Sequence, residues 1–245
     1  MKARMAVILL VLLAFVGTIW WTSRGMAVEI AEPSAAVVNG NVAVFARIVA
    51  RDGPDRLLSA SSPEAESARI VGITEGHAAA IPADSGALLA ADGAYVELIG
   101  VSGELKAGRI VPVELRFENS GLQRFKAVLS DTAAQDYGVK EAGREMNVAI
   151  AVAPNEVGGW QILLQTDGFS FKGREAEGQH VQRDGHGHLY LNGLKLGRMY
   201  GPSQVVGELP HGEHIFSVVL NANTHEAYVN DGVPVAAKVN VTQQD

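Results

Sequence analysis

Beyond residue 27 the chain consists of short hydrophobic runs that are separated by turn-forming residues. The run at 110–117 alternates apolar and polar residues, which is typical of a strand with one buried face. Asn39-Gly40 separates two further runs and suits the positive φ angles of a two-residue turn, so a hairpin is predicted over 35–49. Turn signals recur about every 8–12 residues, as they do in β-sandwiches. The pattern predicts an all-β protein.

The N-terminal segment has the pattern of a membrane-targeting signal. Lys2 and Arg4 precede an uncharged apolar run at 5–21, whose length is at the lower edge of what crosses a bilayer as a helix. Residues 1–24 are therefore predicted to be a hydrophobic helix that acts either as a cleaved signal peptide or as an uncleaved signal anchor. Both alternatives place the chain from about residue 28 in the periplasm and limit membrane contact to this segment.

A small and polar stretch near the middle divides the remaining chain. Residues 131–144 are predicted to be a linker, because apolar alternation stops near residue 130 and resumes at residue 146. We expect a β-sandwich of the cupredoxin or immunoglobulin type on each side, at 28–130 and at 145–245.

Charge and composition exclude several function classes. The net charge of −7 and the isoelectric point of about 5.5 argue against nucleic-acid binding, because such a surface repels phosphate. The chain has no cysteine, which excludes blue-copper centres, iron–sulfur clusters and thiolate zinc sites. Any bound metal must use histidine, methionine, carboxylate or tyrosine ligands.

Six of the seven histidines follow residue 179, and two of them lie on a predicted hairpin. Asn192-Gly193 is a strong signal for a two-residue turn, and such a turn sets the register of its strands. In the simple register His186 faces Met199, and His188 lies on the same side of the ribbon as His186. The two imidazoles and the thioether would then share one face within reach of one metal ion.

These ligands favour copper, as Cu(I) or Cu(II), over calcium or magnesium. His225, after a predicted strand at 215–220, is a fourth candidate ligand. The predicted metal ligands are therefore His186, His188, Met199 and His225. The alternative is a solvated histidine-rich face that binds no metal.

Residues 28–130 resemble the PCuAC family of periplasmic copper chaperones in three stretches, which occur in the family's order. The stretches are GPDRLLSASSP at 53–63, IPA at 81–83 and LKAG continuing to VPVELRFENSG at 105–121. The resemblance implies a β-sandwich that binds Cu(I) through a His and Met pair and a His-x-Met motif. Tyr95 and Glu97 occupy the His-x-Met positions here, and only His77 remains in the loop of the first pair. Two alternatives stay open: a harder metal site of these three residues, or a scaffold or docking module.

Residues 159–241 resemble, more loosely, a His-containing β domain of exported bacterial proteins, some of them copper-linked. The shared stretches are HLYLNG at 188–193 and LNAN followed by His225. Such domains often place an aromatic residue and a histidine where this chain has Ser203 and Gln204.

Together these observations predict a periplasmic copper-binding protein for copper delivery, storage or resistance, with the metal held mainly by the second domain. A copper-accepting membrane or periplasmic protein is the expected partner. No nucleophile–base or paired-carboxylate pattern is present, so the chain is not expected to be an enzyme. The competing hypothesis is a metal-free adaptor module in the cell envelope.

Overall fold

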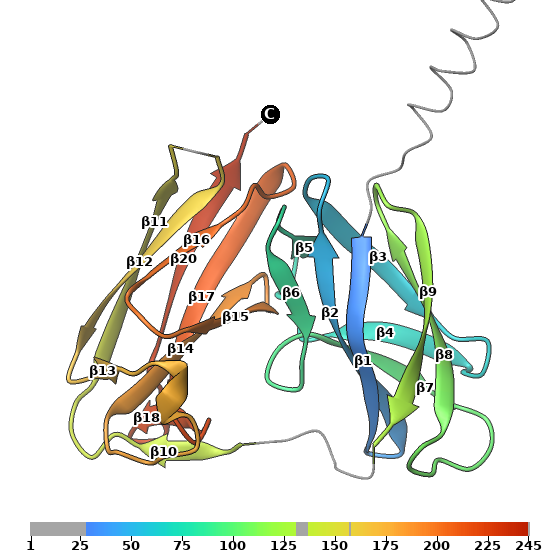
Figure 1. Ribbon diagram of the computed structural model, residues 1–245, viewed down its shortest axis with the longest axis horizontal. Coiled ribbons are helices and arrows are strands. Elements are labelled where there is room, and N and C mark those ends of the chain that lie inside the picture. Colours follow the sequence, from blue (N-terminus) through green and yellow to red (C-terminus); the bar gives the residue numbers. More distant parts are fainter. Residues whose placement is uncertain (1–27, 131–136, 157, 245) are drawn as a thin grey trace, which may run out of the picture.

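The computed structural model describes residues 28–130, 137–156 and 158–244, and these parts are almost entirely β-structure (Figure 1). Their one helical segment is a short 3-10 turn, η1 (Arg174–Ala176). The all-β prediction is confirmed. The hydrophobic helix predicted within 1–24 lies outside the described residues, and no helix in the described part is long and apolar enough to cross a membrane.

Figure 1 shows two groups of strands side by side, which we call the first half (β1–β9) and the second half (β10–β20). The strands of the first half are β1 (Val28–Val38), β2 (Asn41–Ala50), β3 (Asp55–Ser61), β4 (Ser67–Val71), β5 (Ala79–Ile81), β6 (Gly86–Leu89), β7 (Tyr95–Ile99), β8 (Ile110–Phe117) and β9 (Leu122–Leu129). Those of the second half are β10 (Val139–Glu141), β11 (Asn147–Pro154), β12 (Trp160–Asp167), β13 (Ser170–Phe171), β14 (Asp184–Leu191), β15 (Leu194–Met199), β16 (Ser203–Val206), β17 (Gly212–Ala222), β18 (Ala227–Asn230), β19 (Val233–Pro234) and β20 (Ala236–Gln243).

The first half contains the hairpin that the sequence predicts. β1 and β2 form the expected hairpin, and both turn residues have positive φ, 50° at Asn39 and 81° at Gly40. β2 continues to β6 and β7, while β3 pairs with β8 and β8 with β9. The alternating residues of β8 are buried, which places this strand's apolar face in the core.

In the second half, β14 lies between β15 and β17, and β17 continues to β20. A separate sheet of β11, β12 and β16 supplies Trp160, Ile162 and Leu164 to the same core as Leu189 of β14. Within the stretch predicted as a linker, Val139–Glu141 form β10 and pair in parallel with β18. The predicted linker is therefore too long at its C-terminal side, and its residues 131–136 lie outside the described part.

The two halves join through backbone hydrogen bonds as well as side chains. β15 of the second half pairs with β6 of the first at Lys195 and Leu88, so one sheet runs across the boundary (Figure 1). The turn at Asn192 and Gly193 docks on the first half: Thr74 N donates to Asn192 O at 2.9 Å, and Ala94 N donates to Gly193 O at 3.0 Å. Residues 90–94, between β6 and β7, are thereby held beside the β14–β15 hairpin.

Candidate metal centre

The β14–β15 hairpin begins at the predicted turn but does not keep the predicted register. Asn192 and Gly193 have φ angles of 51° and 90°, as the turn requires. Leu191 pairs with Leu194 and Tyr190 with Lys195, but Leu189 then pairs with Gly197 because a β-bulge inserts Leu196.

The bulge corrects the predicted ligand set. It pairs Met199 with Gly187 instead of His186, and Met199 is buried in the hydrophobic core. Arg198 takes the place opposite His188 on the histidine face. Gly197 inside a strand pattern was the available signal, since a glycine there often marks a bulge. The prediction that Met199 faces the histidines is therefore wrong.

Leucine at Met199 should leave copper affinity unchanged within about twofold, because the thioether points into the core. Met and Leu have similar volumes, so the exchange should lower the free energy of unfolding by less than about 1.5 kcal/mol. Metal titration and chemical denaturation of Met199→Leu measure both quantities. A large loss of affinity with little loss of stability would restore Met199 as a ligand.

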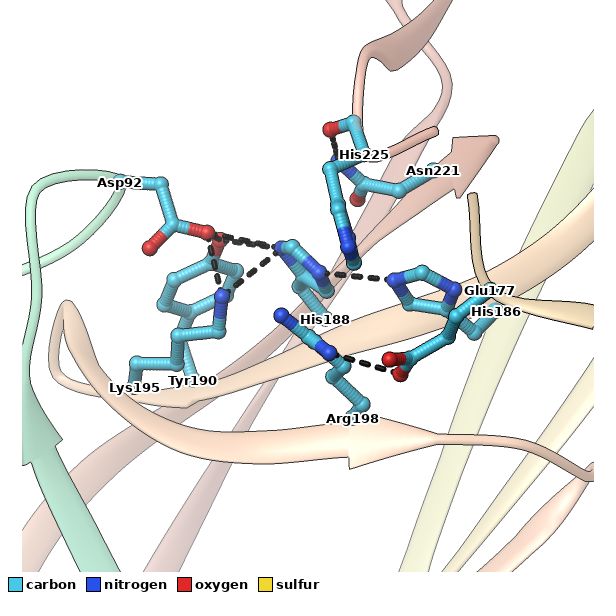
Figure 2. A network of polar contacts seen from close by, with 9 residues as sticks. All are labelled: Asp92, Glu177, His186, His188, Tyr190, Lys195, Arg198, Asn221 and His225. Atoms are coloured by element: carbon cyan, nitrogen blue, oxygen red, sulfur yellow. Dashed lines mark hydrogen bonds and ion pairs between the residues drawn. The ribbon is translucent and has the colours of Figure 1, made fainter. Parts of the chain in front are cut away.

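His186 and His188 lie on the same face of β14 and contact each other inside the protein. Their Nε2 atoms are 3.0 Å apart, and both side chains are almost completely buried (Figure 2). β14 is an interior strand, and its histidine face is covered by His225 and by Asp92 from the loop between β6 and β7.

His225 reaches the same point from the turn between β17 and β18. His225 N donates to Ala222 O at 2.8 Å, and Asn221 Nδ2 donates to His225 O at 2.9 Å, so both ends of this backbone unit are held. Its φ of 80° is rare for a residue with a side chain. Its ring centroid is 5.2 Å from that of His186, and one ligand atom from each of the three histidines lies within 4.8 Å of the others.

Asp92, in the loop between β6 and β7 of the first half, holds His188 from behind (Figure 2). Its Oδ2 is 2.8 Å from His188 Nδ1 and 2.5 Å from Lys195 Nζ. Tyr190 donates its hydroxyl to the same carboxylate at 3.3 Å. We assign the Nδ1 proton of His188 to the contact with Asp92, which leaves its Nε2 lone pair facing His186. Asp92 is not predicted from the sequence, because no local pattern connects it to this hairpin.

The pKa shifts keep the three imidazoles neutral and Asp92 charged. Burial, together with the neighbouring His188 and Arg198, lowers the pKa of His186 to about 3. Burial is also the main cause of the lowered pKa of His188 and of His225. Burial alone would raise the pKa of Asp92, but the His188 hydrogen bond and the Lys195 charge bring it well below its usual range. Neutral imidazole is the form that binds a metal.

A second ion pair closes the side of the cluster near His186. Arg198 Nη1 lies 2.7 Å from Glu177 Oε1 (Figure 2), and the Tyr200 hydroxyl donates to the same oxygen. The Tyr200 hydrogen bond and the Arg198 pairing lower the pKa of Glu177. Because both carboxylates near the cluster are already paired with cations, the histidine nitrogens are its available donors.

The geometry of the donors fits a metal ion. Two metal–nitrogen bonds of about 2.0 Å to atoms 3.0 Å apart enclose an angle of roughly 95–100°, within the range of common coordination geometries. Buried Nδ1 atoms of His186 and His225 have no hydrogen-bond partner among the described residues. In His186 this atom is not the Nε2 that faces His188, so an ion between the two Nε2 atoms would leave it without a partner.

Acid should destabilise the metal-free protein because folding keeps His186 neutral. An unfolded histidine takes up a proton near pH 6.5, whereas the pKa of folded His186 is about 3. The contribution of His186 to the free energy of unfolding is therefore fully present above pH 6.5 and falls as the pH decreases toward 3, by up to about 1.4 kcal/mol per pH unit. Thermal unfolding between pH 7.5 and 4 measures this slope, which should flatten in His186→Gln and persist in exposed His180→Gln. An identical slope in both variants would contradict the assignment.

The weaker candidates in the first half have other contacts. Glu97 accepts a hydrogen bond from Asn41 Nδ2 at 3.0 Å and pairs with Arg69 at 2.6 Å, which explains its lowered pKa. Tyr95 lies 6.0 Å from the Phe45 ring. His77 contacts its own turn, with Nδ1 3.0 Å from Glu75 O. A metal site of His77, Tyr95 and Glu97 stays a prediction, and these contacts offer it no support.

Two cavities flank the cluster at the boundary of the halves. One, of about 660 Å³, is lined by His225 and Asn221 together with Phe45, Tyr95 and Tyr190. The other, of about 650 Å³, is lined by Lys195 and Arg198 on one side and by Arg47 on the other. Both are lined by Asp92, so the histidine site has access to space on either side of this residue.

Comparison with known proteins finds similarity in the first half. Residues 26–129 match a family described as "LpqE-like: Putative lipoprotein LpqE-like". Among solved structures, the apo PCuAC domain from PmoF1 is 25% identical, covers 44% of this chain and 97% of its own, and has a TM-score of 0.40. The copper-bound PCuAC domain from PmoF2 is 23% identical, covers 44% and 96%, and has a TM-score of 0.39. No curated protein matches the chain.

The family match covers the stretch whose sequence resembles PCuAC domains, and solved PCuAC domains are among the similar structures. The family match ends at residue 129, before the histidine cluster begins. The chemistry of that cluster must therefore be argued from its own geometry.

Proposed function

We propose that this chain binds copper outside the cytoplasm, at the cluster formed by His186, His188 and His225. The carrying observation is that three buried imidazoles bring ligand atoms within 4.8 Å of one another. Neutral imidazoles this close together can bind one cation jointly, in the place of a proton shared between two of them. The three ligands come from one strand and one turn, which the surrounding core and hydrogen bonds hold in place.

Copper is the metal that these donors favour. Imidazole suits copper, zinc and nickel, and in nitrogen sites Cu(II) binds more tightly than the other divalent metals of its row. Because Met199 lies in the core, its thioether is not available to favour Cu(I), so Cu(II) is the form we expect. The match of the first half to PCuAC domains, one of them solved with copper, supports the same metal.

Asp92 supports the site as a hydrogen-bond partner of one of the histidine ligands. A histidine ligand in a metal site ordinarily donates its other ring N–H to a carboxylate or carbonyl, which fixes the ring and its protonated nitrogen. Asp92 is placed to do this for His188, and Lys195 holds the carboxylate charged. Since Asp92 belongs to the first half and His188 to the second, copper affinity should depend on contact between the halves.

The chemistry points to binding and transfer instead of catalysis. Lys195, Tyr190 and Asp92 are engaged with one another, so none is available as a free nucleophile or base. The predicted N-terminal signal and the match to a family of putative lipoproteins support a periplasmic, envelope-associated location. A membrane or periplasmic protein that accepts copper is the partner that this role requires.

Copper titration of the purified full-length protein against a competing chelator tests the proposal. We expect one Cu(II) per chain, with a paramagnetic-resonance spectrum that shows nitrogen ligands. A parallel zinc titration should give weaker binding. Absence of copper binding tighter than micromolar would remove this function and leave the metal-free envelope adaptor.

Asparagine at Asp92 should weaken copper binding by about 10–100-fold, the usual cost of losing an outer partner of a metal ligand. The amide keeps the size of the carboxylate but loses the charge that orients the His188 proton. The same titration measures the effect, and Asp84→Asn in an exposed turn of the first half is the control. Equal affinities in wild type and Asp92→Asn would show that His188 needs no support from the first half.

A further inference from the structure

The sheet that crosses the boundary carries basic side chains on the face of the histidine cluster. Arg47 of β2 pairs with Leu88 of β6, and Leu88 pairs with Lys195 of β15. Directly paired residues of neighbouring strands point to the same side of a sheet. Two strand spacings of about 4.8 Å therefore separate the Arg47 and Lys195 backbones, and their side chains stand in one row.

This row borders the cavity of about 650 Å³ between the halves. Arg198 and Arg174 of the second half line it as well, so that four basic side chains from both halves face one space. The acidic lining residues among the described ones are Glu32 and Asp92. The cavity thus has an excess of positive charge in a protein whose net charge is −7.

The four basic groups differ in what they already bind. Lys195 is buried and paired with Asp92, and Arg198 is half-buried and paired with Glu177, which leaves each with further N–H donors. Arg47 and Arg174 have no carboxylate partner within the described part of the chain. These two guanidinium groups are the charges that a ligand could neutralise.

Each of these arginines has a defined place. The Arg47 guanidinium lies over Gly86, where a Cβ would come within 2.7 Å of Nη1, so glycine leaves room for it. The Arg174 guanidinium carbon lies 5.7 Å from the centre of the Tyr200 ring, a cation–π contact. A guanidinium that stacks on a ring still presents its edge N–H groups to a planar oxyanion.

We propose that this cavity is a binding site for a small molecule that carries carboxylate or phosphate oxyanions. Arg47 and Arg174 would supply charge and bidentate donors, and Lys195 and Arg198 would add donors from β15. The volume is that of ordinary small-molecule sites, which supports a ligand larger than a single inorganic ion. The site uses arginines that the copper proposal does not require, so either proposal can fail alone.

Isothermal titration of metal-free protein at low ionic strength tests this, with citrate and inorganic phosphate as separate probes. We expect citrate to bind, and binding to weaken at least about tenfold in the double variant Arg47→Gln/Arg174→Gln. Both residues are exposed, so the variant should fold, as circular dichroism will check. Arg116→Gln removes a single positive charge on β8, outside the cavity lining, and should alter affinity less than twofold.

Removal of an acidic lining residue should change citrate affinity in the opposite direction. Glu32→Gln should tighten citrate binding severalfold, because it removes a like charge from the cavity. Binding of phosphate alone, with the same loss in the double variant, would support the site and identify phosphate as its oxyanion. Absence of binding by both probes, or an equal loss in Arg116→Gln, would overturn the proposal.

Discussion

Alanine at both His186 and His188 should abolish copper binding, with affinity reduced at least about 1000-fold. The two Nε2 atoms, 3.0 Å apart, are the closest pair of donors in the cluster, and their removal leaves His225 alone. Loss of an outer partner already costs a metal site about 10–100-fold, and loss of two direct ligands must cost more. Titration against a chelator measures the change.

The controls must separate lost ligands from lost structure, because both histidines are buried. The double variant His180→Ala/His211→Ala removes two exposed histidines and should bind copper like the wild type. The single variant His225→Ala alters a less buried ring in a turn, so its fold should survive while affinity falls by more than about a hundredfold. Wild-type copper affinity in His225→Ala, together with intact copper binding in His186→Ala/His188→Ala, would refute the site.

Alanine at Gly193 should produce the largest loss of stability among single substitutions in the hairpin, roughly 3–4 kcal/mol. Its φ of 90° already costs a residue with a Cβ about 1–2 kcal/mol. In addition, a Cβ there would lie 2.1 Å from Gly72 O, so the turn would have to leave the first half. The hydrogen bonds from Thr74 N and Ala94 N to this turn would then be lost.

Gly40 offers a matched control for this substitution. It is the second residue of the other Asn-Gly turn, has a φ of 81°, and a Cβ there would meet nothing within 4 Å. Gly40→Ala should therefore cost only the backbone part, about 1 kcal/mol. Chemical denaturation of the two variants compares them, and equal losses would show that the contact between the halves contributes little to stability.

Contact between the halves should also control the proposed copper affinity. Asp92 reaches His188 only while residues 90–94 are held against the β14–β15 hairpin. Gly193→Ala should therefore weaken copper binding as well, in the direction of Asp92→Asn. A variant that separates the halves should therefore lower both the free energy of unfolding and the copper affinity, because Asp92 would no longer reach His188.

Local patterns in the sequence were sufficient for much of the architecture. Strand alternation over 110–117 and the two Asn-Gly turns depend on residues that are neighbours in the chain, so their structural meaning is local. The same holds for the placement of His186 and His188 on one face, which follows from the two-residue period of a strand. The resemblance of residues 28–130 to PCuAC domains also depended on contiguous stretches of sequence.

The composition of the site was decided by tertiary structure. The bulge at Leu196 moved Met199 into the core and brought Arg198 to the histidine face, because the preferred packing of the apolar side chains overrode the simple register. Asp92 is separated from His188 by nearly a hundred residues and reaches it only because β6 and β15 pair across the two halves. By itself the sequence determined the strands, the turns and the two central imidazoles. Only the folded chain determined which groups surround them, since contacts between distant segments leave no periodic trace in the sequence.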